Sequence, residues 1–409
     1  MLGSSRSDAP LVTTARAFVE RRRGILLELL RQLVRIDSRT GREGEIARYL
    51  EGWLSLAGLE ARLEPCKGRS NVVAWSGKGN PALVLSGHLD TVHPLEGGWT
   101  SDPWTPVEQE GRLRALGSSD LKGALAAAAI AALFHKEGSL PGRVVLAYTI
   151  EEETTGDGTA AFVRGAVESG FLDPAATAAV VMEPTGLNHL SLGNRGSIFV
   201  TVTVRGAGGH GSRPHLARNP IPKLRDLLAE ISAVEEAWTA RYPDAEFGGV
   251  SVTPTCVRAG DPERTNSIPE IGSVVLDCRV TPPLEEEGFE RFRREFKEFL
   301  RPLEQEGYAI EVKDEFARPG HRLAADHPLA QTALAVLRED LAIAEAGFAY
   351  TPAANDAVYF ARAGIPTINK LGPGDPAQAH RGDESVEIEK VVLGAIAYAR
   401  LAERWLGPR

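Results

Sequence analysis

Short apolar runs alternate with helix-like stretches over the first half of the chain. Three such runs lie at 82–87, 143–150 and 177–182, and a largely apolar stretch that begins near Asp120 separates the first two. This alternation is typical of a mainly parallel sheet flanked by helices. We therefore expect an α/β fold whose polar residues just beyond the strands, at their carboxyl ends, form the functional edge.

The pattern changes near residue 196, where strand-like runs alternate apolar and polar residues. Strands and helices are expected in the order βαββαβ, at 197–206, 219–238, 249–260, 272–280, 284–307 and 308–316. This order predicts a ferredoxin-like α+β sandwich. Because the set is complete in itself, we predict that 194–316 are inserted into a larger domain made of 1–193 and 317–409. Within the insert, Val274, Leu276, Cys278 and Val280 would share one face of a strand.

Composition and charge narrow the class of protein. The longest apolar stretch, 124–134, is too short to span a bilayer, and the first residues lack a basic patch followed by an apolar segment. Three scattered cysteines, Cys66, Cys256 and Cys278, form no CxxC pair. We expect a cytoplasmic protein. A net charge of -9 argues against nucleic acid and anionic membranes as partners, and the inserted domain shows no basic, aromatic sheet face.

Histidines and carboxylates gather where the predicted strands end. The candidates are His88, Asp90, Asp120, Glu151, Glu152, Glu153, Glu183 and, near the C-terminus, His380. Taken singly, each has an ordinary explanation, such as a surface histidine, a solvated acidic strand end or a helix N-cap at Asp120. Burying them together would be prohibitive without counter-charge. Two histidines and three carboxylates can instead hold two Zn²⁺ ions, with one carboxylate bridging and a fourth acting as a base.

Seven segments in a fixed order carry a resemblance to a known family. They are GHLDTV, SSDLKGALAA, EEETTGDGT, MEPTGL, NRGS, HGSRPH and GPGDPAQAH. Together they resemble the acetylornithine deacetylase, succinyl-diaminopimelate desuccinylase and glutamate carboxypeptidase superfamily of dinuclear zinc hydrolases, from about residue 30 to the end. The resemblance implies a zinc-peptidase-like larger domain with an inserted lid or dimerisation domain.

The same resemblance assigns roles to the clustered residues. His88 and Glu183 would be terminal ligands of one metal, Glu153 and His380 of the other, and Asp120 would bridge them. Zn²⁺ is the implied metal, although Co²⁺ or Mn²⁺ accept the same ligands. Glu152 would be the catalytic base, with a shift of one position along the Glu151–Glu153 triplet left open. Asp90 would fix the tautomer and orientation of the His88 ring.

Residues of the inserted domain are assigned in the same way. His210 would reach across a homodimer interface and hydrogen-bond the oxyanion in the partner's site. Arg195, Asn266 and Arg279 would bind a substrate carboxylate, for which the planar donors of arginine are suited. A surface pair between Asp277 and Arg279 is an equally open reading. His93 is interpreted as a structural or rim residue.

The reaction that the resemblance implies is hydrolysis of an amide bond. Glutamate at Glu183 is typical of the deacylases, which favours a small N-acylated amino acid as substrate. A carboxypeptidase or dipeptidase is the alternative within the superfamily. A non-catalytic metal-binding scaffold is the alternative outside it, and its signature would be a lost base or ligand. This sequence has lost neither.

Overall fold

The computed structural model describes residues 14–304 and 308–407, so most of the N-terminal stretch considered above lies outside the described residues. The chain divides into two compact units. The larger comprises Met1–Leu192, Leu323–Ala349 and Asn355–Arg409, and the smaller comprises Gly193–Arg322 and Tyr350–Ala354. The smaller unit therefore continues past residue 316, where the sequence placed its end, because its last long strand runs on to Arg318.

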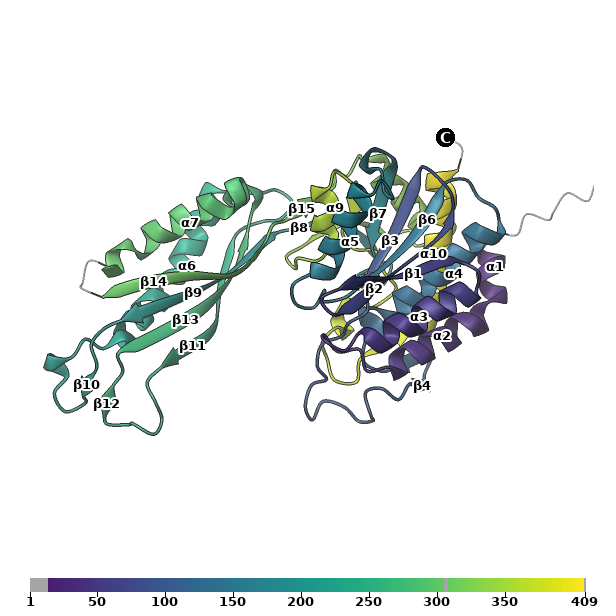
Figure 1. Cartoon of the computed structure of the whole chain (residues 1–409). Helices are drawn as coiled ribbons and strands as arrows, with labels where there is room; N and C mark the ends of the chain where they lie inside the picture. Colours follow the sequence, from purple (N-terminus) through teal and green to yellow (C-terminus); the bar gives the residue numbers. More distant parts are fainter. Residues whose placement is uncertain (1–13, 305–307, 408–409) are drawn as a thin grey trace, which may run out of the picture. The chain divides into compact units, whose positions relative to one another are not determined.

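The larger unit is built on a six-stranded sheet in the order β1-β2-β6-β3-β7-β17 (Figure 1). Its strands are β1 (Glu60–Cys66), β2 (Arg69–Gly77), β3 (Ala82–His88), β6 (Arg143–Thr149), β7 (Thr177–Val181) and β17 (Thr367–Ile368). The strands β6, β3, β7 and β17 run parallel, as predicted, and β1 and β2 add an antiparallel hairpin at one edge. The α/β architecture is thus confirmed, whereas the hairpin was not predicted because β1 has no fully buried residue.

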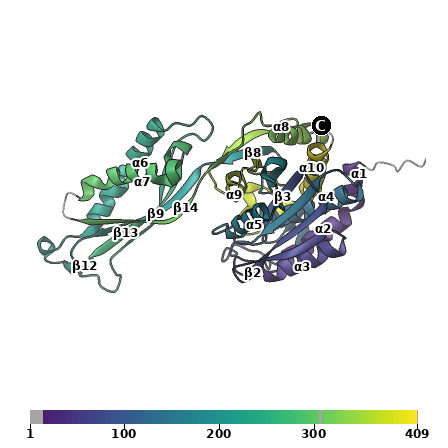
Figure 2. The ribbon, with the colours of Figure 1, turned by 45° about the horizontal axis from the view of Figure 1, so that its top comes forward.

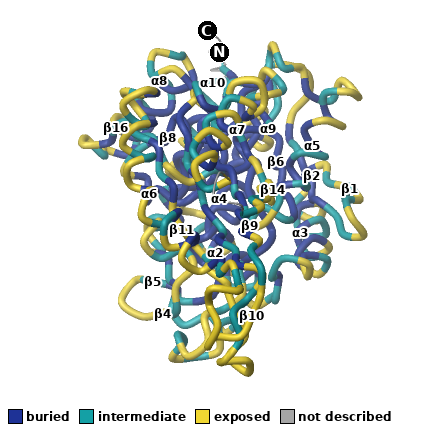
Figure 3. Tube along the Cα trace, turned by 90° about the vertical axis from the view of Figure 1, so that its left-hand side faces the viewer, coloured by how far each residue is buried: buried dark blue, intermediate teal, exposed yellow. Residues whose placement is uncertain are grey.

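Helices cover both faces of this sheet. They are α1 (Ala15–Arg21), α2 (Arg23–Arg35), α3 (Gly44–Leu56), α4 (Gly123–Glu137), α5 (Asp157–Glu168), α8 (Pro328–Ala335), α9 (Ala357–Arg362) and α10 (Ile388–Leu406). Helices α4 and α10 pack together on one face, and α5 and α9 contact the other. Every residue of α4 from Gly123 to His135 is buried, and its trace lies among the dark blue segments of Figure 3. No helix within 14–304 and 308–407 is long and apolar enough to cross a membrane.

The smaller unit is a four-stranded antiparallel sheet in the order β11-β13-β9-β14. Its elements are β9 (Gly196–Arg205), α6 (Pro220–Arg241), β11 (Ser251–Ala259), β13 (Ile271–Val280), α7 (Pro282–Glu304) and β14 (Ala309–Arg318). Both helices lie on one face of the sheet (Figures 1 and 2), so the predicted βαββαβ sandwich is confirmed. Val274, Leu276, Cys278 and Val280 all belong to its core, on the predicted face.

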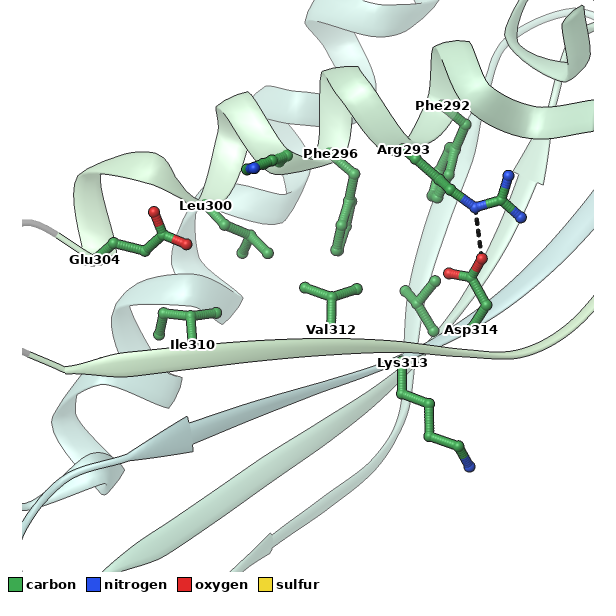
Figure 4. A pocket seen from close by; sticks show the side chains of 11 residues that line it. Phe292, Arg293, Phe296, Leu300, Glu304, Ile310, Val312, Lys313 and Asp314 are labelled. Carbon is green, nitrogen blue, oxygen red and sulfur yellow. Dashed lines mark hydrogen bonds and ion pairs between the residues drawn. The ribbon is translucent and has the colours of Figure 1, made fainter. Parts of the chain in front are cut away.

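Figure 4 shows how α7 packs on the edge strand β14. Phe296 and Leu300 of the helix face Ile310 and Val312 of the strand, and both helix residues are 2% exposed. An ion pair between Arg293 and Asp314, 2.6 Å from Nε to Oδ2, ties the two elements together on the solvent side (Figure 4). Between them these side chains line a pocket of about 620 Å³ that lies between α7 and β14 (Figure 4).

Short strands complete the description. One sheet pairs β18 (Ser385–Glu387), β5 (Arg112–Arg114) and β4 (Val107–Gln109), and another pairs β15 (His321–Arg322), β8 (His189–Asn194) and β16 (Gly347–Thr351). A two-residue ribbon joins β10 (Gly209–His210) to β12 (Ser267–Ile268).

Candidate metal centre

The candidate ligands of the larger unit lie at one edge of its sheet. His88 is the last residue of β3 and pairs in register with Thr149, the last residue of β6, so Glu151–Glu153 follow at the same edge. Glu183 comes two residues after β7 ends at Val181. Because the three strands are parallel neighbours, their carboxyl ends bring these side chains together.

Asp120 reaches the same place from the turn before α4. The sequence suggested that this helix begins near Asp120, but it begins at Gly123. Its N-cap residue is Lys122, whose side chain makes no capping hydrogen bond. Asp120 itself lies in the preceding turn, Ser118–Lys122, with backbone angles outside the helical region. Its carboxylate therefore does not cap the helix but points to His88, 3.2 Å from Oδ1 to Nε2.

Two groups of potential metal ligands share Asp120. In the first, His88 Nε2 lies 3.2 Å from Asp120 Oδ1 and 3.6 Å from Glu183 Oε1. In the second, His380 Nε2 lies 3.0 Å from Glu153 Oε2 and 3.7 Å from Asp120 Oδ2. Within each group the ligand atoms all lie within 4.8 Å of one another. The structure thus brings together all five residues that the sequence proposed as ligands, with Asp120 in the middle.

The donor set suits divalent cations. Glu183 Oε1 is buried and has no hydrogen-bond partner among the described residues, an arrangement that is costly unless a cation satisfies it. Burial alone would lower the pKa of His88, but the hydrogen bond with Asp120 and nearby carboxylates outweigh it and hold that pKa well above its ordinary value. Imidazole nitrogen and carboxylate oxygen are ligands that Zn²⁺, Co²⁺ and Mn²⁺ share. The residues therefore fit a pair of such ions.

Asp90 supports the centre differently from the prediction. The His88 Nδ1–H donates to the main-chain oxygen of Asp90 at 2.8 Å, whereas the nearest carboxylate oxygen is 3.7 Å away. The Asp90 carboxylate accepts hydrogen bonds from the backbone N–H groups of Glu152 and Glu153, at 3.1 and 3.2 Å, and from the Thr40 hydroxyl at 2.9 Å. Its main chain thus orients the ring, and its side chain fixes the acidic turn after β6.

The three acidic residues of that turn have different surroundings. Glu151 forms ion pairs with Arg69 and Lys67. Glu153 belongs to the second ligand group. Burial and the charge of Glu183 raise the pKa of Glu152 well above its ordinary value. This distribution matches the register in which Glu152 is the base and Glu153 the ligand.

Sequence reasoning missed two charged residues beside the ligands, the partly buried Lys370 and the buried Glu384. Lys370 Nζ lies 3.3 Å from Glu183 Oε2. Burial lowers the pKa of Lys370, but the surrounding carboxylates outweigh burial, so the net pKa is raised. Glu384 accepts hydrogen bonds from the backbone of the Asp120 turn, and burial raises its pKa to about 7 against the effect of those bonds. Lys370 comes two residues after β17, so its strand-end position was the available signal.

The candidates of the smaller unit lie in two places, His210 with Asn266 and Arg195 with Arg279. His210 is exposed on the β10–β12 ribbon beside Asn266, and its Nδ1 accepts a hydrogen bond from the Ser212 N–H at 3.2 Å, which leaves Nε2 as a donor. Arg195 donates to the Gly249 carbonyl oxygen. Arg279 is paired with Asp277, 2.7 Å from Nε to Oδ1, so the pair that the sequence left open is present.

His93 belongs to the larger unit and is exposed. Its Nδ1 lies 3.4 Å from Arg39 Nη1, and it is in neither ligand group.

Metal uptake is expected to release protons at pH 7. The hydrogen bond with Glu153 raises the pKa of His380 to about 9, so its ring is largely protonated in the metal-free protein. A ring must be neutral to bind a metal. The apparent metal affinity should therefore rise from pH 7 toward pH 9, and it should flatten only when both His380 and His88, whose pKa is also raised by Asp120 and nearby carboxylates, are neutral. Calorimetric titration with Zn²⁺ in buffers of different ionisation enthalpy measures the release; uptake without proton release would contradict the assignment, and His93→Ala should behave as the wild type.

Comparison with known proteins identifies the family of the chain. Residues 84–404 match the sequence model of peptidase family M20/M25/M40. An acetylornithine deacetylase of Proteus mirabilis is 28% identical over 88% of this chain and 92% of its own length. A succinyl-diaminopimelate desuccinylase of Stenotrophomonas maltophilia is 30% identical over 93% of this chain and 99% of its own length.

Solved structures show the same fold. A family M20 metallo-carboxypeptidase of Sulfolobus solfataricus is 16% identical and superposes with a TM-score of 0.76, over 93% of this chain and 99% of the other. A dinuclear metal-binding peptidase of Bacillus subtilis is also 16% identical, with a TM-score of 0.63 over 96% and 99% of the two chains. At these identities the likeness concerns the fold alone. Because the family match extends over well more than half of the sequence, this chain belongs to peptidase family M20/M25/M40.

Proposed function

We propose that this protein removes the acyl group from a small N-acylated amino acid. As a member of its family it is a metallohydrolase that acts on amide bonds. The observation that carries the proposal is the pair of ligand groups that share Asp120, with Glu152 beside them. The two relatives compared above are a deacetylase and a desuccinylase, which supports deacylation over peptide cleavage.

The metals proposed are two Zn²⁺ ions. His88 and Glu183 would hold one, Glu153 and His380 the other, and Asp120 both. When bound, the ions supply Lewis acidity for an amide carbonyl and lower the pKa of nearby water. Co²⁺ and Mn²⁺ are chemically acceptable substitutes for the same ligands.

Glu152 moves the proton in the proposed reaction. Its carboxylate accepts a proton from the attacking water as the water oxygen bonds to the carbonyl carbon, and then delivers it to the nitrogen as the C–N bond breaks. A pKa raised by burial suits both transfers, because the group must bind the proton and later release it. The hydrogen bond from the Glu152 N–H to Asp90 keeps the residue in place between the two transfers.

The smaller unit is proposed to act from a partner subunit in a homodimer. His210 presents Nε2–H as a donor on an exposed ribbon, which suits stabilisation of the tetrahedral oxyanion in the other chain's site. Asn266, exposed beside it, and Arg195 are the candidates for binding a substrate carboxylate. Three free cysteines favour the cytoplasm as the location of this protein.

A panel of matched amides tests the substrate class. The zinc-loaded protein and its chelated form are assayed against N-acetyl and N-succinyl amino acids and against dipeptides with the same C-terminal residue. We expect zinc-dependent release of free amino acid from the acylated compounds. Cleavage confined to dipeptides would establish a peptidase instead, and zinc binding without cleavage of any compound would favour a non-catalytic scaffold.

A further inference from the structure

A buried carboxylate ties the segment that carries His380 to the turn that carries Asp120. Glu384 lies four residues after His380 and is 2% exposed. Its Oε2 accepts a hydrogen bond from the Gly117 N–H at 2.7 Å, and its Oε1 accepts from the N–H groups of Ser119 at 2.8 Å and Asp120 at 3.0 Å. One side chain therefore accepts hydrogen bonds from three backbone N–H groups of the turn.

A second set of contacts joins the same two segments. The Ser119 hydroxyl accepts a hydrogen bond from the Asp375 N–H at 2.8 Å and donates to the Asp375 carbonyl oxygen at 3.1 Å. At Gly374 a Cβ atom would lie 2.0 Å from the Ser119 carbonyl oxygen, so only glycine permits this approach. The turn and the His380 segment are thus packed backbone to backbone.

Glu384 is chemically specialised for this contact. It forms no ion pair with any residue in the described part of the chain, although burying an unpaired carboxylate is costly. A carboxylate only accepts hydrogen bonds, and here it meets only donors. Because its oxygens are occupied by the backbone and it belongs to neither ligand group, Glu384 acts on the centre through Asp120 rather than as a ligand.

We propose that Glu384 is a positioning residue that sets the separation of Asp120 and His380 and thereby the affinity of the second metal group, Asp120, Glu153 and His380. The inference rests on the proposed metal centre and extends it to a residue outside the ligand set. The first group depends less on this contact, because His88 and Glu183 come from the ends of neighbouring strands of the sheet.

The decisive variant is Glu384→Gln. The amide NH₂ of glutamine would face backbone N–H groups, so at least one bond to the turn becomes a contact between two donors. We expect the second zinc ion to bind roughly 10- to 100-fold more weakly while the first keeps its affinity. Stepwise calorimetric titration of the metal-free protein measures both affinities, and the absorption spectrum after the second equivalent of Co²⁺ reports whether the ligand geometry has changed.

Glu387→Gln is the matched control. Glu387 is exposed on β18, three residues further on, and pairs with Arg112 at 3.0 Å, so its replacement should leave both affinities unchanged. If Glu384→Gln folds poorly, Ser119→Ala removes the hydroxyl bonds to Asp375 and should weaken the second site in the same direction.

The outcomes separate this inference from the proposed function. The positioning role would be overturned if Glu384→Gln and Ser119→Ala both bound the first and the second zinc ion with wild-type affinity. It would also be overturned if both sites were weakened equally and the melting temperature fell, because that result marks a general structural defect. A wild-type protein that binds no metal would overturn the proposed metal centre itself, and the positioning role with it.

Discussion

Glu152→Gln is expected to lower kcat by roughly 10⁴-fold while two zinc ions remain bound. Glutamine keeps the size of the side chain and can still contact its neighbours, but it cannot take a proton from water or return one to the leaving nitrogen. Glu152 lies outside both ligand groups, so metal content should not change. Single-turnover rates and metal analysis of the same preparation measure both quantities.

Glu151→Gln is the control for that experiment, because it tests the register of the acidic triplet. Glu151 is bound to Arg69 and Lys67, away from the ligand groups, so its loss should affect stability more than turnover. If Glu151→Gln lost turnover with both metals bound while Glu152→Gln stayed active, the register would be shifted by one residue and the role assigned to Glu152 would be wrong.

Mixing two inactive variants, His210→Ala and Glu152→Gln, is expected to restore activity. Removing one oxyanion donor should lower kcat by about 10²- to 10³-fold. In a mixed dimer, one of the two sites would combine an intact Glu152 from one chain with an intact His210 from its partner. Subunits are exchanged under mild dissociating conditions, and the rate of the mixture is compared with that of each variant alone.

His215→Ala is the control for the mixing experiment, since His215 is exposed in the same segment of the smaller unit and has no role in the proposed site. It should be as active as the wild type by itself. A monomer in gel filtration that retains full activity, or a mixture no more active than its components, would rule out a donor supplied by the partner.

The larger features of the fold were predictable because they follow from periodicity. Buried parallel strands appear as short apolar runs, and the edge where they end could be located before any motif was considered. The same logic pointed to His88 and Glu183, each at or just beyond the end of a strand. The β1–β2 hairpin escaped notice because β1 has mixed polarity and no buried residue, so it leaves no such run.

The finer features depended on contacts that a sequence does not display. Helix α4 begins at Gly123, directly after a turn that is hydrogen-bonded to Glu384, a residue more than 260 positions away along the chain. That Asp90 orients His88 with a main-chain oxygen reflects the geometry of a strand end rather than the identity of the residue. Lys370 resembles any surface lysine until β17 places it beside Glu183.

The strands through which the chain enters and leaves the main segment of the smaller unit, Gly193–Arg322, lie side by side. In β8 and β15, Asn194 pairs with His321 and Gly193 with Arg322, and the Leu323 N–H donates to the Leu192 carbonyl oxygen at 2.7 Å. A module grafted between two such neighbouring points imposes almost no loop-closure entropy on its host. A longer or shorter insert at 193–322 would therefore leave the order of the strands in the larger sheet unchanged.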